Sequence, residues 1–139
     1  MGFQRILVPT DLTDRATKAL DLALTLTAPT GPRVTLLHVI ETVRGLEFEE
    51  AKPFYQKLEQ KAGRMMATVR ERLPNTSAEV IQEIVYGDRA EEIVRFAVAH
   101  NIDLIVLASH RVTSSGIRDW GTISYKVGIL APCPVLLVK

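Results

Sequence analysis

The sequence predicts an α/β fold of the doubly wound class, with a five-stranded parallel sheet covered by helices on both faces. Short apolar runs, typical of buried parallel strands, alternate with segments whose apolar residues recur at helical spacing. The resulting order is βαβαβαβαβ, and such an alternation requires right-handed crossovers between parallel strands. A chain of 139 residues has an ordinary length for one domain, so we expect residues 1–139 to form a single domain.

The first half of the chain supplies two strands and two helices. Residues 5–8 are the first apolar run, and Pro9 is expected to end it because proline cannot continue a strand ladder. Thr13 is a candidate N-cap for a helix with small apolar residues at helical spacing. Residues 33–40 predict the second strand, and residues 46–73 predict a long charged helix.

A third strand is predicted over residues 78–85. This run is less uniformly apolar than the others, which favours a place near the sheet edge. Asp88, followed by Glu91 three residues later, resembles a capping box at the start of the next helix. Asn101 is expected to close that helix.

The last third of the chain contains the expected anion site. Residues 103–108 form a continuous apolar run, and a polar loop over residues 109–116 follows it. A helix is expected to begin near Gly121. Free backbone N–H groups at that helix start, together with the hydroxyls of Thr122 and Ser124, could receive a phosphate.

Composition excludes several classes of protein. Lys and Arg number 17 against 16 for Asp and Glu, so no whole-molecule field indicates binding to nucleic acid. No long apolar segment predicts a signal region, a transmembrane helix or insertion into a membrane. The one cysteine, Cys133, cannot form an internal disulfide and is expected to be a buried structural thiol. These observations predict a cytoplasmic protein.

The fold class also predicts where a ligand would bind. In a doubly wound sheet, ligands bind at the carboxyl ends of the strands, where the strand order reverses, which here is expected between the first and fourth strands. Pro9, Thr10 and Asp11 would then lie opposite residues 108–111. This geometry permits a nucleotide whose phosphates reach the helix start near Gly121.

Four segments of the chain carry a family resemblance through their order and spacing: residues 5–11, 36–39, 87–93 and 131–138. Over essentially the whole chain they resemble the universal stress protein A family, small α/β proteins that bind an adenine nucleotide or have a degenerate form of that site. The resemblance implies an adenine-nucleotide alpha-hydrolase-like fold with strand order 3-2-1-4-5. It also implies dimerisation through the last strand.

The nucleotide motif of that family is only partly kept. The motif is a glycine, two residues, a second glycine, nine residues, and then a glycine followed by serine or threonine. Gly121 and Thr122 match its end, but Ala108 and Arg111 occupy the two earlier glycine positions. Because Arg111 adds a long cation and resists the left-handed backbone that glycine permits, the phosphate cradle is expected to be altered.

The site residues that the resemblance implies are spread along the chain. They are Pro9, Thr10, Asp11, Val39, Ala108, His110, Arg111, Gly121, Thr122, Ile123 and Ser124. Val39 would offer backbone groups to adenine, and the ligand would be ATP or AMP. No metal site of the protein's own is expected, since Mg²⁺ would reach Asp11 only on a bound nucleotide.

Two of these residues have alternative roles. Arg111 could contact phosphate, with His110 and Arg118 nearby, or it could fill or point away from an abandoned pocket. Asp11 could contact ribose or a metal-bound phosphate, or it could be a turn carboxylate before the first helix. The sequence leaves both pairs of roles open.

No catalytic constellation is predicted, because no histidine has a nucleophile and an orienting carboxylate at a recognisable spacing. Together with this absence, the family resemblance implies a stress-response or signalling protein that binds an adenine nucleotide weakly or in altered form, without rapid catalysis. One alternative is an interaction module that has lost the nucleotide. Another is a slow Mg²⁺-dependent ATP hydrolase.

The final strand predicts a homodimer. Val135, Leu136, Leu137 and Val138 form an apolar terminal strand. An unpaired edge of this kind is an aggregation hazard, so a second copy of the chain is expected to cover it. Nucleotide occupancy would then bias binding to a further, unidentified protein partner.

Overall fold

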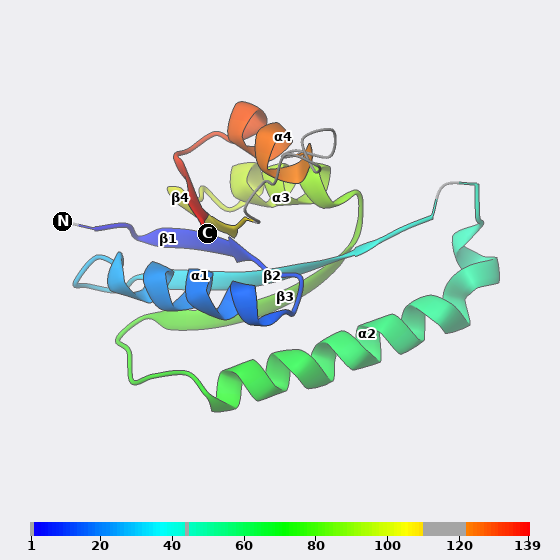
Figure 1. Cartoon of the computed structure of the whole chain (residues 1–139), viewed down its shortest axis with the longest axis horizontal. Helices are drawn as coiled ribbons and strands as arrows, with labels where there is room; N and C mark the ends of the chain where they lie inside the picture. Colours follow the sequence, from blue (N-terminus) through cyan, green and yellow to red (C-terminus); the bar gives the residue numbers. More distant parts are fainter. Residues whose placement is uncertain (1, 44, 110–121) are drawn as a thin grey trace.

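The computed structural model describes residues 2–43, 45–109 and 122–139, which form one twisted parallel sheet with helices on both faces (Figure 1). The strands are β1 (Arg5–Pro9), β2 (Arg33–Glu41), β3 (Glu79–Gly87), β4 (Leu104–Ala108) and β5 (Val135–Val138). Their order in the sheet is β3-β2-β1-β4-β5, and all four pairs of neighbours are parallel. The predicted fold class and strand order are confirmed.

Two helices cover each face of the sheet. They are α1 (Asp14–Thr25), α2 (Phe48–Glu71), α3 (Arg89–Ala99) and α4 (Thr122–Leu130). The helices α1 and α2 lie on one face, and α3 and α4 lie on the other (Figure 1). The described helices include none that is both long and apolar enough to cross a membrane.

The strands bury both of their faces because successive side chains point to opposite sides of the sheet. Ile6 and Val8 of β1 join Leu20 of α1 in one hydrophobic core, whereas Leu7 joins Ile93 of α3 in the other. All five side chains are at most 2% exposed. Burial of each contributes about 1.5–3 kcal/mol, which explains why the strands are continuous apolar runs.

The two edges of the sheet differ in composition. β3 lies at one edge, as its polar residues predicted, and Gln82 and Glu83 are among these polar residues. β5 lies at the other edge, where Leu136 and Leu137 are exposed. The second edge is therefore the one that an additional strand could cover favourably.

The ends of α3 were predicted correctly. Asp88 is the N-cap, and its carboxylate accepts a hydrogen bond from the backbone N–H of Glu91 at 3.0 Å. After the helix, Asn101 adopts a left-handed backbone with φ of 52°. Asparagine tolerates this conformation better than most residues, so it ends the helix where the sequence placed the boundary.

Candidate functional site

The sheet opens between β1 and β4 near the carboxyl ends of these strands. The ladder from β1 to β4 covers Ile6 and Leu7, whereas the ladder from β1 to β2 continues to Pro9. β1 lies between β2, which leads toward β3, and β4, which leads toward β5. The strand order thus reverses at this position, where doubly wound sheets bind their ligands.

Pro9 accounts for the opening. The N–H of Thr10 donates to the carbonyl oxygen of Leu37 on β2 at 2.8 Å, whereas the carbonyl oxygen of Arg5 accepts from the N–H of Asp103, just before β4, at 2.9 Å. Backbone groups of β1 therefore face β2 and β4 alternately, and Pro9 belongs to the set that faces β4. Proline has no N–H to donate there. The prediction that Pro9 lies outside the first strand was wrong, because the ladder to β2 does not need that donor.

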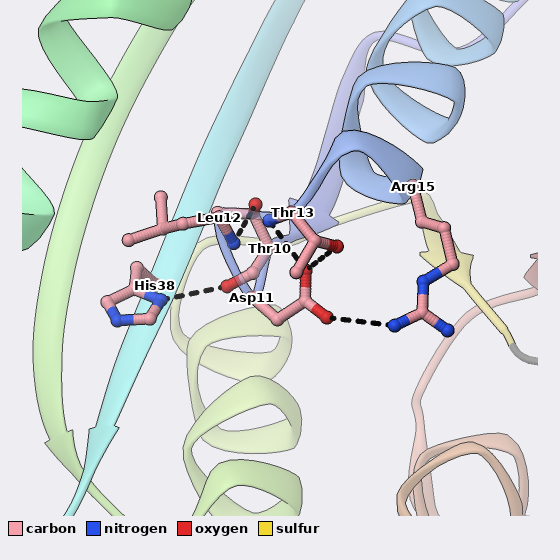
Figure 2. Close-up of polar contacts among 6 residues, drawn as sticks. All are labelled: Thr10, Asp11, Leu12, Thr13, Arg15 and His38. Atoms are coloured by element: carbon pink, nitrogen blue, oxygen red, sulfur yellow. Dashed lines mark hydrogen bonds and ion pairs between the residues drawn. The ribbon is translucent and has the colours of Figure 1, made fainter.

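The loop between β1 and α1 is held by its own side chains (Figure 2). The hydroxyl oxygen of Thr10 accepts from the N–H of Leu12 at 2.9 Å. One carboxylate oxygen of Asp11 accepts from both the backbone N–H, at 2.9 Å, and the hydroxyl of Thr13. Thr13 is the N-cap residue as predicted, but its hydroxyl binds Asp11 instead of capping the helix. These bonds are those of turns in which short polar side chains replace backbone acceptors.

Asp11 is an anion at neutral pH. Partial burial raises the pKa of its carboxyl, but the hydrogen bonds from Thr13 and the charge of Arg15 outweigh this and hold the pKa below the usual 3.8. The guanidinium of Arg15 lies 3.9 Å from the carboxylate, four residues along the chain. The side chain of Asp11 is 37% exposed, which leaves lone pairs of its carboxylate oxygens open to a ligand hydroxyl.

His38 supports the same loop from the neighbouring strand. Its Nδ1 lies 2.9 Å from the carbonyl oxygen of Thr10, and since a carbonyl can only accept, Nδ1 carries the hydrogen (Figure 2). His38 is half-buried in β2, as expected of a structural histidine. It therefore fixes the position at which β1 passes into the loop.

The remaining predicted site residues fall on both faces of the sheet. Val39 is 3% exposed and packs in the core beneath α3, whereas Ala108 packs against the core beneath α1. Ile123 also packs against the core beneath α3, and Ser124 is half-buried in the first turn of α4. The side chains of Val39 and Ala108 thus point to opposite faces of the sheet.

The start of α4 agrees with the sequence, and part of the expected phosphate receptor is described. The helix begins at Thr122, one residue after the predicted start at Gly121. His110, Arg111 and Gly121 lie outside the described residues.

The described residues provide no group of three or more His, Cys, Asp or Glu side chains that could hold a metal ion. Cys133 is half-buried, and burial, followed by the nearby charge of Asp103, raises the pKa of its thiol. A thiol with a raised pKa is a poor nucleophile and a poor metal ligand, as expected of a structural cysteine. Near Asp11, the described side chains offer hydrogen bonding and charge recognition.

Sequence reasoning missed the role of Arg15 and the two hydrogen bonds that Thr13 donates to Asp11. The signal was present, since an acceptor two residues before a threonine is typical of such turns, and Arg15 stands one helical turn after Asp11. It also missed the role of Pro9 in separating β1 from β4. That role depends on which neighbour each backbone group of β1 faces, which no local pattern specifies.

Comparisons with known proteins give one consistent result. A model of the universal stress protein family matches residues 2–139. A universal stress protein of Thermus aquaticus, encoded in the QAH/OAS sulfhydrylase 3′ region, is 32% identical over 99% of both chains. The universal stress protein YxiE of Bacillus subtilis is 30% identical, also over 99% of both chains.

Solved structures agree with the sequence comparison. The structure of MJ0577 superposes with a TM-score of 0.82 at 29% identity, covering 100% of this chain and 97% of that one. Two others share the fold at lower identity. A universal stress protein in complex with cAMP has a TM-score of 0.66 at 20% identity, and one from Archaeoglobus fulgidus in complex with dAMP has 0.67 at 21%. They cover 100% of this chain and 98% and 100% of theirs, respectively.

Proposed function

The chain belongs to the universal stress protein family, and on that basis we propose that it is a cytoplasmic, homodimeric stress-response or signalling protein that binds an adenine nucleotide. The proposed site lies at the carboxyl ends of β1 and β4. The observation that carries it is Asp11, an ionised carboxylate that Thr13 holds by hydrogen bonds in the loop after β1, beyond the point where the ladder to β4 ends. Residues 1–139 act as one domain in this proposal.

Each part of an adenine nucleotide has a counterpart at this site. Asp11 accepts hydrogen bonds from the ribose hydroxyls, and the backbone of Val39 meets the adenine ring. Phosphate lies at the start of α4, where Gly121, Thr122, Ile123 and Ser124 supply N–H groups and hydroxyls. The solved family members with cAMP and dAMP support a ligand with one adenine and one phosphate.

The binding is weak or altered because two glycine positions of the family motif are changed. Ala108 and Arg111 occupy these positions. A nucleotide needs close backbone approach there, and side chains impede it. Arg111, with His110 beside it, offers a cation to phosphate in place of backbone contacts. Occupancy by ATP, with Mg²⁺ on its phosphates, or by AMP then biases binding of a protein partner.

Homodimerisation is proposed on the surface of β5 and α4. Leu136 and Leu137 of β5 are exposed, and so are Tyr125, Ile129 and Leu130 of the adjoining helix. These exposed apolar side chains lie on an unpaired sheet edge and on the helix that contacts it, and apolar side chains are typical of homodimer interfaces. A second copy of the chain would cover the same residues by two-fold symmetry.

Isothermal titration of the nucleotide-stripped protein tests the proposal. The titrants are ATP and AMP, each with and without Mg²⁺, and the variants are Asp11→Ala, Arg111→Gly and the matched control Asp14→Ala, which removes an exposed carboxylate from the first turn of α1. We expect binding by the wild type and Asp14→Ala, and affinity lower by roughly tenfold or more in Asp11→Ala. Weaker binding by Arg111→Gly would identify Arg111 as a phosphate ligand, and stronger binding would identify it as an obstruction.

Two other functions are distinguished in the same experiment. A wild type that binds neither ATP nor AMP overturns the nucleotide proposal and favours an interaction module, for which the changed glycine positions and the apolar surface of α4 and β5 argue. Mg²⁺-dependent release of phosphate that Asp11→Ala abolishes would instead identify a slow ATP hydrolase.

A further inference from the structure

A hollow lies between α1 and the last turns of α2, on the face of the sheet opposite α3 and α4. Its volume is about 260 Å³. The floor is apolar and consists of Ala16 and Leu20 of α1 and Leu36 of β2, and α2 contributes Met65 and Val69 to the wall. An apolar cavity of about 150 Å³ accepts benzene, so this hollow has room for a substituted ring.

The mouth of the hollow is polar. Thr13 and Thr17 contribute hydroxyls from the α1 side, and Thr68 contributes one from α2. The exposed side chains of Asp14 and Asp21 on α1 and of Arg72 at the end of α2 also line the hollow. The guanidinium of Arg72 forms no ion pair with the described part of the chain.

This arrangement selects against charged ligands. The lining carries charges of both signs, so an ion of either sign meets attraction as well as repulsion there, and it loses hydration as it approaches the apolar floor. An uncharged group meets both hydrogen-bond donors and acceptors there, since the threonine hydroxyls serve in either role. The hollow therefore favours a ligand with an apolar body on the floor and a neutral polar group at the mouth.

The hollow is separate from the proposed nucleotide site but shares a wall with it. Thr10, Leu12 and Thr13 line the hollow, and Asp11 stands between them in the chain. Figure 2 shows the side chain of Leu12 on the side of His38, away from Asp11 and Arg15. One short loop thus presents a carboxylate on one side and an apolar side chain on the other.

Leu12 adopts an unusual backbone conformation to do this. Its φ is 67°, in the left-handed region that bulky side chains rarely occupy. Strain of this kind persists only where the surroundings hold the residue in place. Here the hydroxyl of Thr10 binds the N–H of Leu12, and the leucine side chain packs against the core beneath α1.

We propose that the hollow between α1 and α2 binds a small uncharged amphipathic molecule, with a ring or short hydrocarbon body and one hydroxyl or amide group. The body lies on Ala16, Leu20 and Leu36, and the polar group meets the threonines at the mouth. A ligand there contacts Leu12 and so biases the loop that holds Asp11. This linkage, unlike the binding itself, rests on the proposed nucleotide function, and it is reciprocal by thermodynamic necessity.

Methyl NMR of the full chain tests the proposal, with benzyl alcohol as the probe. We expect saturable shifts of the methyl signals of Ala16, Leu20, Leu36 and Met65. Benzoate and benzylamine should bind roughly tenfold more weakly, as expected if the lost hydration of a full charge costs about 1.4 kcal/mol. Absence of saturable shifts at these methyls, or equal affinity for all three probes, would overturn the proposal.

Two variants place the binding in the hollow. Thr68→Phe adds a ring at the mouth and should abolish the shifts, whereas the matched control Ala67→Phe, on the neighbouring exposed position of α2 outside the lining, should not. Thr17→Phe repeats the block from α1 and should also abolish them. Both blocked positions are exposed, so the variants retain the core. Equal shifts in Thr68→Phe and Ala67→Phe would contradict the assignment.

The linkage has its own readout. AMP is titrated with and without saturating benzyl alcohol, and its affinity should change in the wild type and stay constant in Thr68→Phe. If benzyl alcohol binds in the hollow and AMP does not bind at all, the proposed nucleotide function fails while the site stands. If AMP binds and benzyl alcohol does not, the proposed nucleotide function stands and the proposed ligand site in the hollow fails.

Discussion

The carboxylate of Asp11 accepts hydrogen bonds from both the backbone N–H and the hydroxyl of Thr13. These two hydrogen bonds set the shape of the loop after β1, because one carboxylate oxygen of Asp11 holds Thr13, the N-cap residue of α1. An ionised Asp11 is therefore part of the folded structure whether or not a ligand is bound.

The first prediction is a pH dependence of stability. Because the pKa of Asp11 is lower in the folded chain than its usual 3.8, its ionised bonds stabilise the fold above that value, and this contribution is lost as the pH falls through the folded-state pKa. The free energy of unfolding of the wild type minus that of Asp11→Asn should be constant from about pH 5 to 7 and should shrink below about pH 4. Because the side chain is partly exposed, the difference should stay below about 1 kcal/mol.

Urea unfolding at a series of pH values measures this difference. Thr13→Val removes the hydroxyl while keeping the shape of the side chain, so it should reduce the pH dependence in the same range. An unchanged pH profile in both variants would show that these bonds do not form in solution.

The second prediction concerns the strained residue Leu12. Leu12→Val should lower the free energy of unfolding by about 1–2 kcal/mol more than Leu12→Met, because a β-branched side chain fits a positive φ poorly and an unbranched one keeps the packing. Chemical denaturation of the two variants measures the difference. Equal stability would mean that the left-handed conformation is not maintained.

The third prediction concerns the gap between β1 and β4. Pro9→Ala supplies the N–H that proline lacks toward β4 and so allows the ladder to extend and narrow the crevice. Nucleotide affinity should fall several-fold, and the new amide at position 9 should be protected from hydrogen exchange. Pro29→Ala, in an exposed loop, is the control and should leave affinity unchanged. An unprotected amide with unaltered affinity would contradict the role given to Pro9.

The fourth prediction tests the proposed dimer. Leu137→Glu places a charge on the exposed edge strand and should convert the dimer into a monomer in sedimentation at micromolar concentration. Phe54→Glu makes the same change at an exposed position of α2, away from β5, and should leave the dimer intact. A wild type that sediments as a monomer would refute the interface.

The sequence predicted the sheet well because its strands are buried on both faces, which requires continuous apolar runs such as that of β4. Asn101 and Asp88 were predictable for a similar reason, since each satisfies a local requirement of helix ends. These features depend on neighbours in the chain.

The hollow between α1 and α2 could not be predicted in this way. Leu20 and Met65 are parts of ordinary helical patterns, and only the packing of the two helices on the sheet leaves space between them. The role of Arg15 depends likewise on the direction in which Asp11 points. The resemblance to a family supplied the position of the candidate site, whereas its chemistry follows from these contacts.

The central position of β1 has a consequence for the growing polypeptide. β1 is synthesised first and β2 follows it, but β4, its neighbour on the other side, comes only after β3 and α3. During that interval one side of β1 is an open strand edge, on which another nascent chain could add. Pro9 withholds a hydrogen-bond donor from that side, and an edge that lacks a donor is a poorer template for a foreign strand. The same missing N–H that shortens the ladder to β4 in the finished protein therefore also makes this side of β1 less suited to pairing with a foreign strand while β4 is absent.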